Sequence, residues 1–174
     1  MSSKLNMIVA QRRLDVAAAK AHTSPSALRA RITTSPNDFV ATLRARATPV
    51  ALLAEMKRAS PSKGDIAKGV DAAQQALSYA LAGAATISVL TEPNWFKGSL
   101  TDLERVRRAL EEGGLSPGVC VLRKDFIIDE YQLLEARAYG ADTALLIVAS
   151  LPIDELKMLM VNPPSQCTSP LSKR

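Results

Sequence analysis

Charged side chains end two of the apolar runs in this 174-residue sequence. Glu55 and Lys57 close the run VALLAEMK, and Lys124 closes the run VCVLRK. Burying a charge at the end of an apolar strand is costly unless the charge is paired or used in function. These three side chains are therefore the first candidates for a binding or catalytic site.

The segment that follows Lys57 has the composition of an anion-binding turn. Residues 60–64, SPSKG, force the chain to turn and place hydroxyl and backbone N–H groups beside the side chain of Lys63. Such groups suit an anionic ligand. An edge strand with a solvated end, followed by an ordinary surface loop, explains the same residues.

Side-chain alternation predicts which of these groups share a face of their strand. Glu55 and Lys57 are two residues apart, so they point the same way. Lys124 points the same way as Phe126, whereas Asp125 points to the opposite side. We therefore expect Lys124 to lie on a face of its strand that also carries an aromatic ring.

Strand and helix patterns alternate along most of the chain, and the strands begin near residues 50, 86, 119 and 143. Asp71 and Asp129 are placed as helix N-caps, and Thr101 with Glu104 forms a capping box. Such repeated units predict a parallel sheet covered by helices. A doubly wound sheet and a (β/α)8 barrel both satisfy this pattern, and the sequence has none of the glycine-rich nucleotide-binding motifs.

Composition limits the class of protein. The sequence is 47% hydrophobic and 22% charged, which is typical of one soluble domain with its own core. Its most apolar run, residues 143–151, is shorter than the roughly 20 residues that a membrane span needs. Cys120 and Cys167 do not make a disulfide framework, so we expect a reducing compartment. The expected location is the cytoplasm, with a plastid not excluded.

The positive charge is concentrated at the N-terminus. Residues 1–48 hold eight Lys and Arg against two Asp, a net charge of +6, although the whole chain has a formal charge of only +5. A transit peptide or a nucleic-acid-binding arm has this composition. Residues 5–20, however, have the pattern of a helix. We interpret its basic residues as a solvated helix face.

Four segments of the sequence together resemble the indole-3-glycerol phosphate synthase family: QRRLDVAAAK, AEMKRASPSKG, TEPNWFKGSL and RKDFI. The resemblance covers about residues 5–156. It implies an α/β fold, a (β/α)8 TIM barrel that is truncated after about four units. Residues 1–48 would form an N-terminal helical extension that packs over the barrel mouth, 49–160 the first half of the barrel, and 161–174 a tail outside the family without regular structure.

The resemblance also implies an activity and a site. The family closes the indole ring of 1-(2-carboxyphenylamino)-1-deoxyribulose 5-phosphate, with loss of carbon dioxide and water, as a lyase of tryptophan biosynthesis that uses no metal and no organic cofactor. In this sequence Lys57 matches a residue that binds anionic groups of the substrate, Lys124 the general acid, and Glu55 a carboxylate that interacts with both. The matching substrate-binding positions are Ser60, Phe96, Phe126, Leu145 and Ile147.

The sequence departs from the family after residue 156. The base, a further carboxylate and most of the phosphate contacts come from strands five to eight of the family's barrel, which this chain lacks. A catalytically inactive half-barrel, or an interaction fragment, is therefore the first alternative, and a basic anion- or nucleic-acid-binding module is the second.

The resemblance and the truncation together define the expected partners. We expect a small anionic substrate with carboxylate and phosphate groups, and neither nucleic acid nor a membrane. Open sheet edges would favour self-association or complementation by the missing half-barrel. The apolar side chains expected to be exposed include Leu53, Leu122, Leu145 and Ile147.

Overall fold

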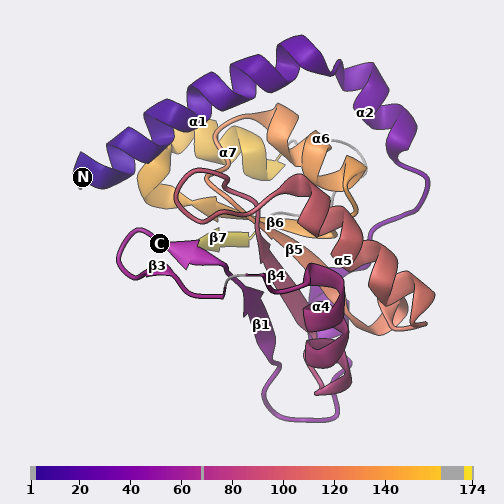
Figure 1. Ribbon diagram of the computed structural model, residues 1–174. Coiled ribbons are helices and arrows are strands. Elements are labelled where there is room, and N and C mark those ends of the chain that lie inside the picture. Colours follow the sequence, from indigo (N-terminus) through magenta and orange to yellow (C-terminus); the bar gives the residue numbers. More distant parts are fainter. Residues whose placement is uncertain (1–2, 68, 162–170, 174) are drawn as a thin grey trace.

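The computed structural model describes residues 3–67, 69–161 and 171–173, and it shows an α/β fold (Figure 1). Its parallel sheet has the strand order β1-β4-β5-β6-β7, and a separate antiparallel hairpin is formed by β2 and β3. The strands are β1 (Leu53–Met56), β2 (Ala59–Ser60), β3 (Gly64–Asp65), β4 (Thr86–Leu90), β5 (Cys120–Lys124), β6 (Thr143–Ile147) and β7 (Leu171–Lys173).

Seven α-helices are described, three of them before the sheet begins. None of the described helices is long and apolar enough to cross a membrane. The helices are α1 (Ser3–His22), α2 (Pro25–Arg31), α3 (Phe39–Arg44), α4 (Ala72–Leu81), α5 (Leu100–Glu112), α6 (Glu130–Ala138) and α7 (Ile153–Val161), with 3-10 turns η1 (Ser116–Gly118) and η2 (Val148–Ser150).

The main core lies between the sheet and the helices α4 and α5. Ile87 and Val89 of β4 and Val121 of β5 point toward these helices and are at most 1% exposed. The apolar stripe of α5 meets them there, with Leu103 and Leu110 fully buried. Fully burying such a side chain stabilises the fold by about 1.5–3 kcal/mol. This packing leaves the opposite face of the sheet free of α4 and α5; we call it the site face.

The helix starts confirm two of the three predicted caps. Asp71 and Asp129 accept hydrogen bonds from the N–H groups of Gln74 and Tyr131, respectively. The prediction for α5 was wrong by two residues. Ser99 is the N-cap, because it is extended and its Oγ accepts a hydrogen bond from the N–H of residue 102 at 3.0 Å.

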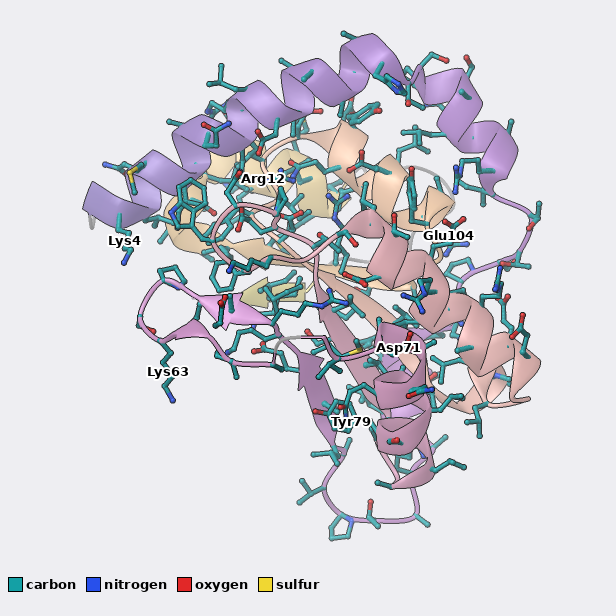
Figure 2. All side chains as sticks on the ribbon, in the orientation of Figure 1. Lys4, Arg12, Lys63, Asp71, Tyr79 and Glu104 are labelled. Atoms are coloured by element: carbon teal, nitrogen blue, oxygen red, sulfur yellow. The ribbon has the colours of Figure 1, made fainter. Side chains whose placement is uncertain are left out.

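The N-terminal helix α1 lies across the carboxyl ends of the strands (Figure 1). Figure 2 shows Arg12 pointing from α1 into the body of the molecule, where its guanidinium contacts Asp15 at 2.9 Å and Asp125 at 3.0 Å. At its two ends, the helix is held by hydrogen bonds from Lys4 to the Pro61 carbonyl at 3.2 Å and from Lys20 to Asp129 at 2.7 Å. The interpretation of a solvated basic face was therefore wrong for Arg12, which is 6% exposed and serves to dock the helix.

Helix α6 packs against the N-terminal helices as well as the sheet. Tyr131 and Leu134 of α6 form a cluster with Val16 of α1 and Leu28 of α2. The Tyr131 hydroxyl also donates to the carbonyl of Ala19. The apolar stripe of α6 thus fixes the N-terminal segment in place.

The C-terminal residues add a strand that was not predicted. Residues 171–173 form β7, which pairs in parallel with β6. Without β7, the backbone N–H and C=O groups on the side of β6 away from β5 would lack a partner strand, which gives a physical reason for this pairing. Residues 162–170 and 174 lie outside the described residues, so the prediction of a tail without regular structure is not addressed there, nor is Cys167. Cys120 is buried and forms no disulfide with another described residue.

The prediction of exposed side chains was correct for Leu53, which is 43% exposed, and wrong for Leu122, which is 4% exposed. Leu122 lies in β5, a central strand flanked by β4 and β6, whereas Leu53 lies in the edge strand β1. Leu145 and Ile147 are half-buried.

Replacing Arg12 tests the docking of α1. Arg12→Met leaves the fully buried carboxylate of Asp125 with one cation fewer, so we expect the free energy of unfolding to fall by about 3 kcal/mol. Arg13→Met is the matched control, since Arg13 is 53% exposed and 3.9 Å from Glu155; we expect it to cost less than about 0.5 kcal/mol. Urea unfolding measures both, and equal losses would contradict the docking role.

The edge at β1 predicts self-association. Val50 is 76% and Leu52 53% exposed beside an edge of β1 that has no paired strand among the described residues, and such edges pair with other chains. We expect light scattering to show species larger than a monomer, and Val50→Lys combined with Leu52→Lys to reduce them. Leu14→Lys, on the outer surface of α1, should have no such effect. A monodisperse monomer of the unaltered chain would contradict this expectation.

Candidate functional site

Glu55, Lys57 and Lys124 meet on the site face of the sheet. The Glu55 carboxylate lies between the two lysines: Lys57 Nζ is 2.7 Å from Oε1, and Lys124 Nζ donates to Oε2. In the described part of the chain, Glu55 is the one carboxylate in contact with either lysine. The cluster therefore carries a net charge of +1, which suits an anionic ligand.

Strand register explains why groups far apart in sequence meet. Met56 pairs with Val89 and Leu90 pairs with Lys124, so residue 57 is level with Lys124 across β4. Met56 and Val121 pack toward the helices, so alternation directs Lys57 and Lys124 to the opposite face. Parallel pairing places both at the carboxyl ends of their strands.

The Glu55 carboxylate is partly buried and strongly paired. Burial by itself would raise the pKa of Glu55, but the hydrogen bonds from Lys124 and Lys57 outweigh burial, so the pKa lies below its usual range. About a third of each lysine side chain is exposed, and 28% of the Glu55 side chain. The two ammonium groups are therefore held in place by Glu55 and are still open to a ligand.

Two aromatic rings pack together beside β5. The ring centroids of Phe96 and Phe126 are 6.1 Å apart, and the planes are tilted by 43°. Phe126 lies two residues beyond Lys124, the last residue of β5, and Phe96 comes from the loop between β4 and α5. The structure thus brings an apolar aromatic surface to the strand end that carries Lys124.

The chain before Phe126 is fixed by a buried ionic network that sequence reasoning missed. Asp125 accepts hydrogen bonds from Arg12, Arg123 and Thr91, and its other oxygen accepts the Phe126 N–H at 2.8 Å. Burial by itself would raise the pKa of Asp125, but the charges of Arg123 and Arg12 outweigh burial, so the pKa lies below its usual value. The signal in the sequence was the alternation RKD, which directs Arg123 and Asp125 away from Lys124.

Glu92 was also missed. It is fully buried, and its carboxylate accepts hydrogen bonds from the backbone N–H groups of residues 94, 95 and 96. The sequence did contain a signal for this contact, since an acidic side chain can accept hydrogen bonds from the backbone N–H groups of residues that follow it closely in a loop. Glu92 thereby shapes the loop that carries Phe96.

The remaining predicted positions are near the site without joining the cluster. Ser60 lies in the hairpin, where its Oγ accepts a hydrogen bond from Lys63 N at 3.2 Å and lies 3.4 Å from Ser62 Oγ. Leu145 and Ile147 of β6 point to the side opposite the buried Leu146. Continuing the pairing of β5 with β6 by one residue places Leu145 level with Lys124.

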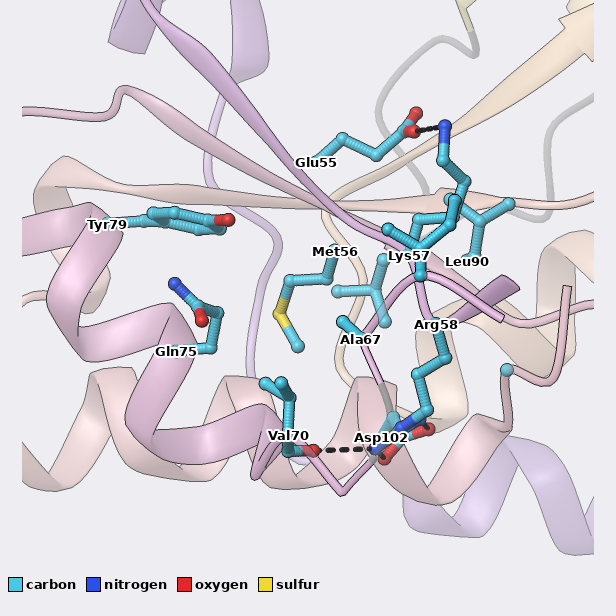
Figure 3. Close-up of a pocket in the computed structure, with 13 residues that line it drawn as sticks. Glu55, Met56, Lys57, Arg58, Ala67, Val70, Gln75, Tyr79, Leu90 and Asp102 are labelled. Carbon is cyan, nitrogen blue, oxygen red and sulfur yellow. Dashed lines mark hydrogen bonds and ion pairs between the residues drawn. The ribbon is translucent and has the colours of Figure 1, made fainter. Parts of the chain in front are cut away.

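A cavity of about 330 Å³ lies beside β1, largely on the other face of the strand (Figure 3). Figure 3 shows the Glu55–Lys57 ion pair at its margin, whereas Met56, Gln75 and Tyr79 line the space toward α4. Neither Lys124 nor the aromatic pair lines this cavity. The cavity is therefore separate from the predicted site for the most part.

No group of three or more His, Cys, Asp and Glu side chains is placed to hold a metal ion among the described residues. The lysine cluster and the aromatic pair can instead bind an anion and a ring, and a lysine ammonium can donate a proton.

Replacing Glu55 tests the lowered pKa of its carboxylate. A carboxyl group whose pKa is lower in the folded than in the unfolded state stabilises the fold above its unfolded pKa, about 4.3, and this contribution is lost as the pH falls through the folded value. We therefore expect the stability of the unaltered chain relative to Glu55→Gln to be highest near neutral pH and to decrease below about pH 4. Urea unfolding across this range measures it, and a relative stability that increases on acidification would contradict the assigned pairing.

Comparison with known proteins identifies the family. A model of the indole-3-glycerol phosphate synthase family matches residues 5–170, beyond the end near residue 156 that sequence resemblance indicated. A multifunctional tryptophan biosynthesis protein of Phanerodontia chrysosporium is 51% identical over 96% of this chain and 22% of its own length.

A single-function relative shows the same match. The indole-3-glycerol phosphate synthase of Roseiflexus castenholzii is 47% identical over 92% of this chain, which spans 60% of the length of that relative. The match includes the strands that carry Glu55, Lys57 and Lys124. The chain belongs to the indole-3-glycerol phosphate synthase family.

Proposed function

We propose that the cluster of Glu55, Lys57 and Lys124 serves the ring closure of 1-(2-carboxyphenylamino)-1-deoxyribulose 5-phosphate, with loss of carbon dioxide and water, in tryptophan biosynthesis. We also propose that the parallel sheet is the first part of a (β/α)8 barrel. The contact of both lysines with one carboxylate at the carboxyl ends of the strands is the observation that carries the proposal, because active sites of such barrels lie at that face.

Each side chain has a role that fits its position. Lys57 binds an anionic group of the substrate, and Lys124 donates a proton to the ketone oxygen as the ring carbon attacks. Glu55, hydrogen-bonded to both, orients the two ammonium groups. The substrate must therefore bind with its ketone oxygen toward Lys124.

The apolar residues fit the aromatic part of the substrate. Phe96 and Phe126 offer tilted ring faces, against which a carboxyphenyl ring can pack. Leu145 and Ile147 supply apolar surface on β6, and the Ser60 hydroxyl is available as a hydrogen-bonding group at the hairpin. The chemistry of this set is that of a small anionic aromatic substrate rather than a nucleic acid or a membrane.

A second candidate is a half-barrel that is inactive by itself. It is favoured because the one carboxylate in contact with the lysines, within the described residues, is committed to both of them and is unsuited to act as a free base. The basic N-terminus gives less support to a nucleic-acid-binding module, since Arg12 and Lys20 are paired with carboxylates of the same chain.

The activity of the 174-residue chain separates these candidates. We expect it to form indole-3-glycerol phosphate at least about a thousandfold more slowly than an intact relative, because a base and phosphate contacts are each worth roughly a hundredfold or more. Fluorescence of the indole product measures the rate. A rate close to that of the relative would contradict the half-barrel proposal.

Complementation tests the role of the site itself. Adding the remaining C-terminal part of the Roseiflexus castenholzii relative as a separate chain should raise the rate, and Lys124→Met should abolish the gain. Lys157→Met, at an exposed position on α7, is the matched control and should retain the gain. If Lys124→Met is complemented as well as the control, Lys124 is not the acid.

A further inference from the structure

The loop that carries Phe96 is built around one buried carboxylate. Glu92 is fully buried and directly follows β4 and Thr91. Its Oε1 accepts the N–H of Asn94 at 2.9 Å, and its Oε2 accepts those of Trp95 at 2.7 Å and Phe96 at 3.0 Å. Hydrogen bonds to an ionised acceptor are the stronger kind. Three successive N–H groups are thus turned toward a single side chain.

The rest of the loop can take only a narrow range of conformations. The N–H of Gly98 donates to the Glu92 carbonyl at 2.9 Å, which closes the loop on itself. A Cβ atom at Gly98 would lie 2.0 Å from the Leu90 carbonyl oxygen, so no larger residue fits there. Lys97 has a φ of 54°, in the left-handed region that side chains other than glycine rarely adopt. Such a conformation persists where the surrounding contacts require it.

The loop is attached to the site at both ends. The N–H of Thr91, where the loop begins, donates to the carbonyl of Lys124 at 3.0 Å. This hydrogen bond ties the start of the loop to the backbone of the proposed acid. The Lys97 ammonium pairs with Asp65 of β3, in the hairpin that follows β1. The ring of Phe96 is thereby held against that of Phe126.

We propose that Glu92 is a positioning residue, whose buried carboxylate binds the N–H groups of residues 94–96 and so holds Phe96 against Phe126 beside Lys124. Glu92 does not touch the substrate in this proposal; it acts through the loop backbone. The importance of Phe96 for ring closure rests on the proposed function, whereas the position of the loop can be measured without any activity.

Glu92→Gln is the decisive variant because it keeps the shape of the side chain and removes the charge. Its amide NH2 group would face one or two of the three backbone N–H donors, which cannot then be paired. We expect amide hydrogen exchange at residues 94–96 to become at least about tenfold faster. Amides of β4 and β5 should keep their protection, because the proposal concerns the loop and not the sheet.

Two spectroscopic signatures report the same loop. Trp95 is the only tryptophan of the chain, so its acrylamide quenching reports this loop alone and should increase in Glu92→Gln. The proton NOE between the rings of Phe96 and Phe126 should be lost. Glu112→Gln is the matched control, since Glu112 is 69% exposed and pairs with Arg108 on the surface of α5; it should change neither signal.

The outcomes decide the proposal separately from the proposed function. Local loss of protection with a retained sheet supports it, even if the chain has no activity. Unchanged exchange, quenching and NOE in Glu92→Gln would overturn it. If that variant loses the whole fold, the unaltered chain still decides: amides of residues 94–96 that exchange at the rate of unstructured peptides would refute the hydrogen bonds themselves.

Discussion

The buried carboxylate of Asp125 is the interaction on which the arrangement of the site depends. It joins Arg12 of α1, Arg123 of β5 and Thr91 at the end of β4. A charge with no exposed surface is costly unless it is fully paired, so losing any of these three partners destabilises the fold. Lys124 and Phe126 are the neighbours of Asp125 on either side, and they are fixed with it.

Alternation along β5 divides its end between two tasks. Arg123 enters the ionic network and contacts Glu135 of α6 at 2.8 Å, whereas Lys124 points to the site face and reaches Glu55. A shift of one residue in register would exchange these environments and bury a lysine without its partner. The network therefore protects the register as well as docking α1 over the strand ends.

The loops add a second level of order around the same strand ends. Glu92 shapes the loop after β4, and the pairing of Lys97 with Asp65 links that loop to the hairpin after β1. By contrast, the outer edge of β1 has no strand beside it among the described residues, and Val50 and Leu52 are exposed there. The molecule is thus ordered where the site lies and open where the sheet ends.

Local patterns in the sequence determined the order of strands and helices, the caps at Asp71 and Asp129, and the common face of Glu55 and Lys57, because periodicity and capping act over a few residues. Only the tertiary structure decided that Arg12 is buried, that Glu92 organises the Phe96 loop and that residues 171–173 pair with β6. These depend on partners more than a hundred residues away, on backbone N–H groups whose direction is set by the loop, and on an unpaired strand edge. The burial of Arg12 and the pairing of residues 171–173 arise only when distant segments are brought into contact. The contacts of Glu92 are local, but they form only when the loop turns its N–H groups toward the carboxylate.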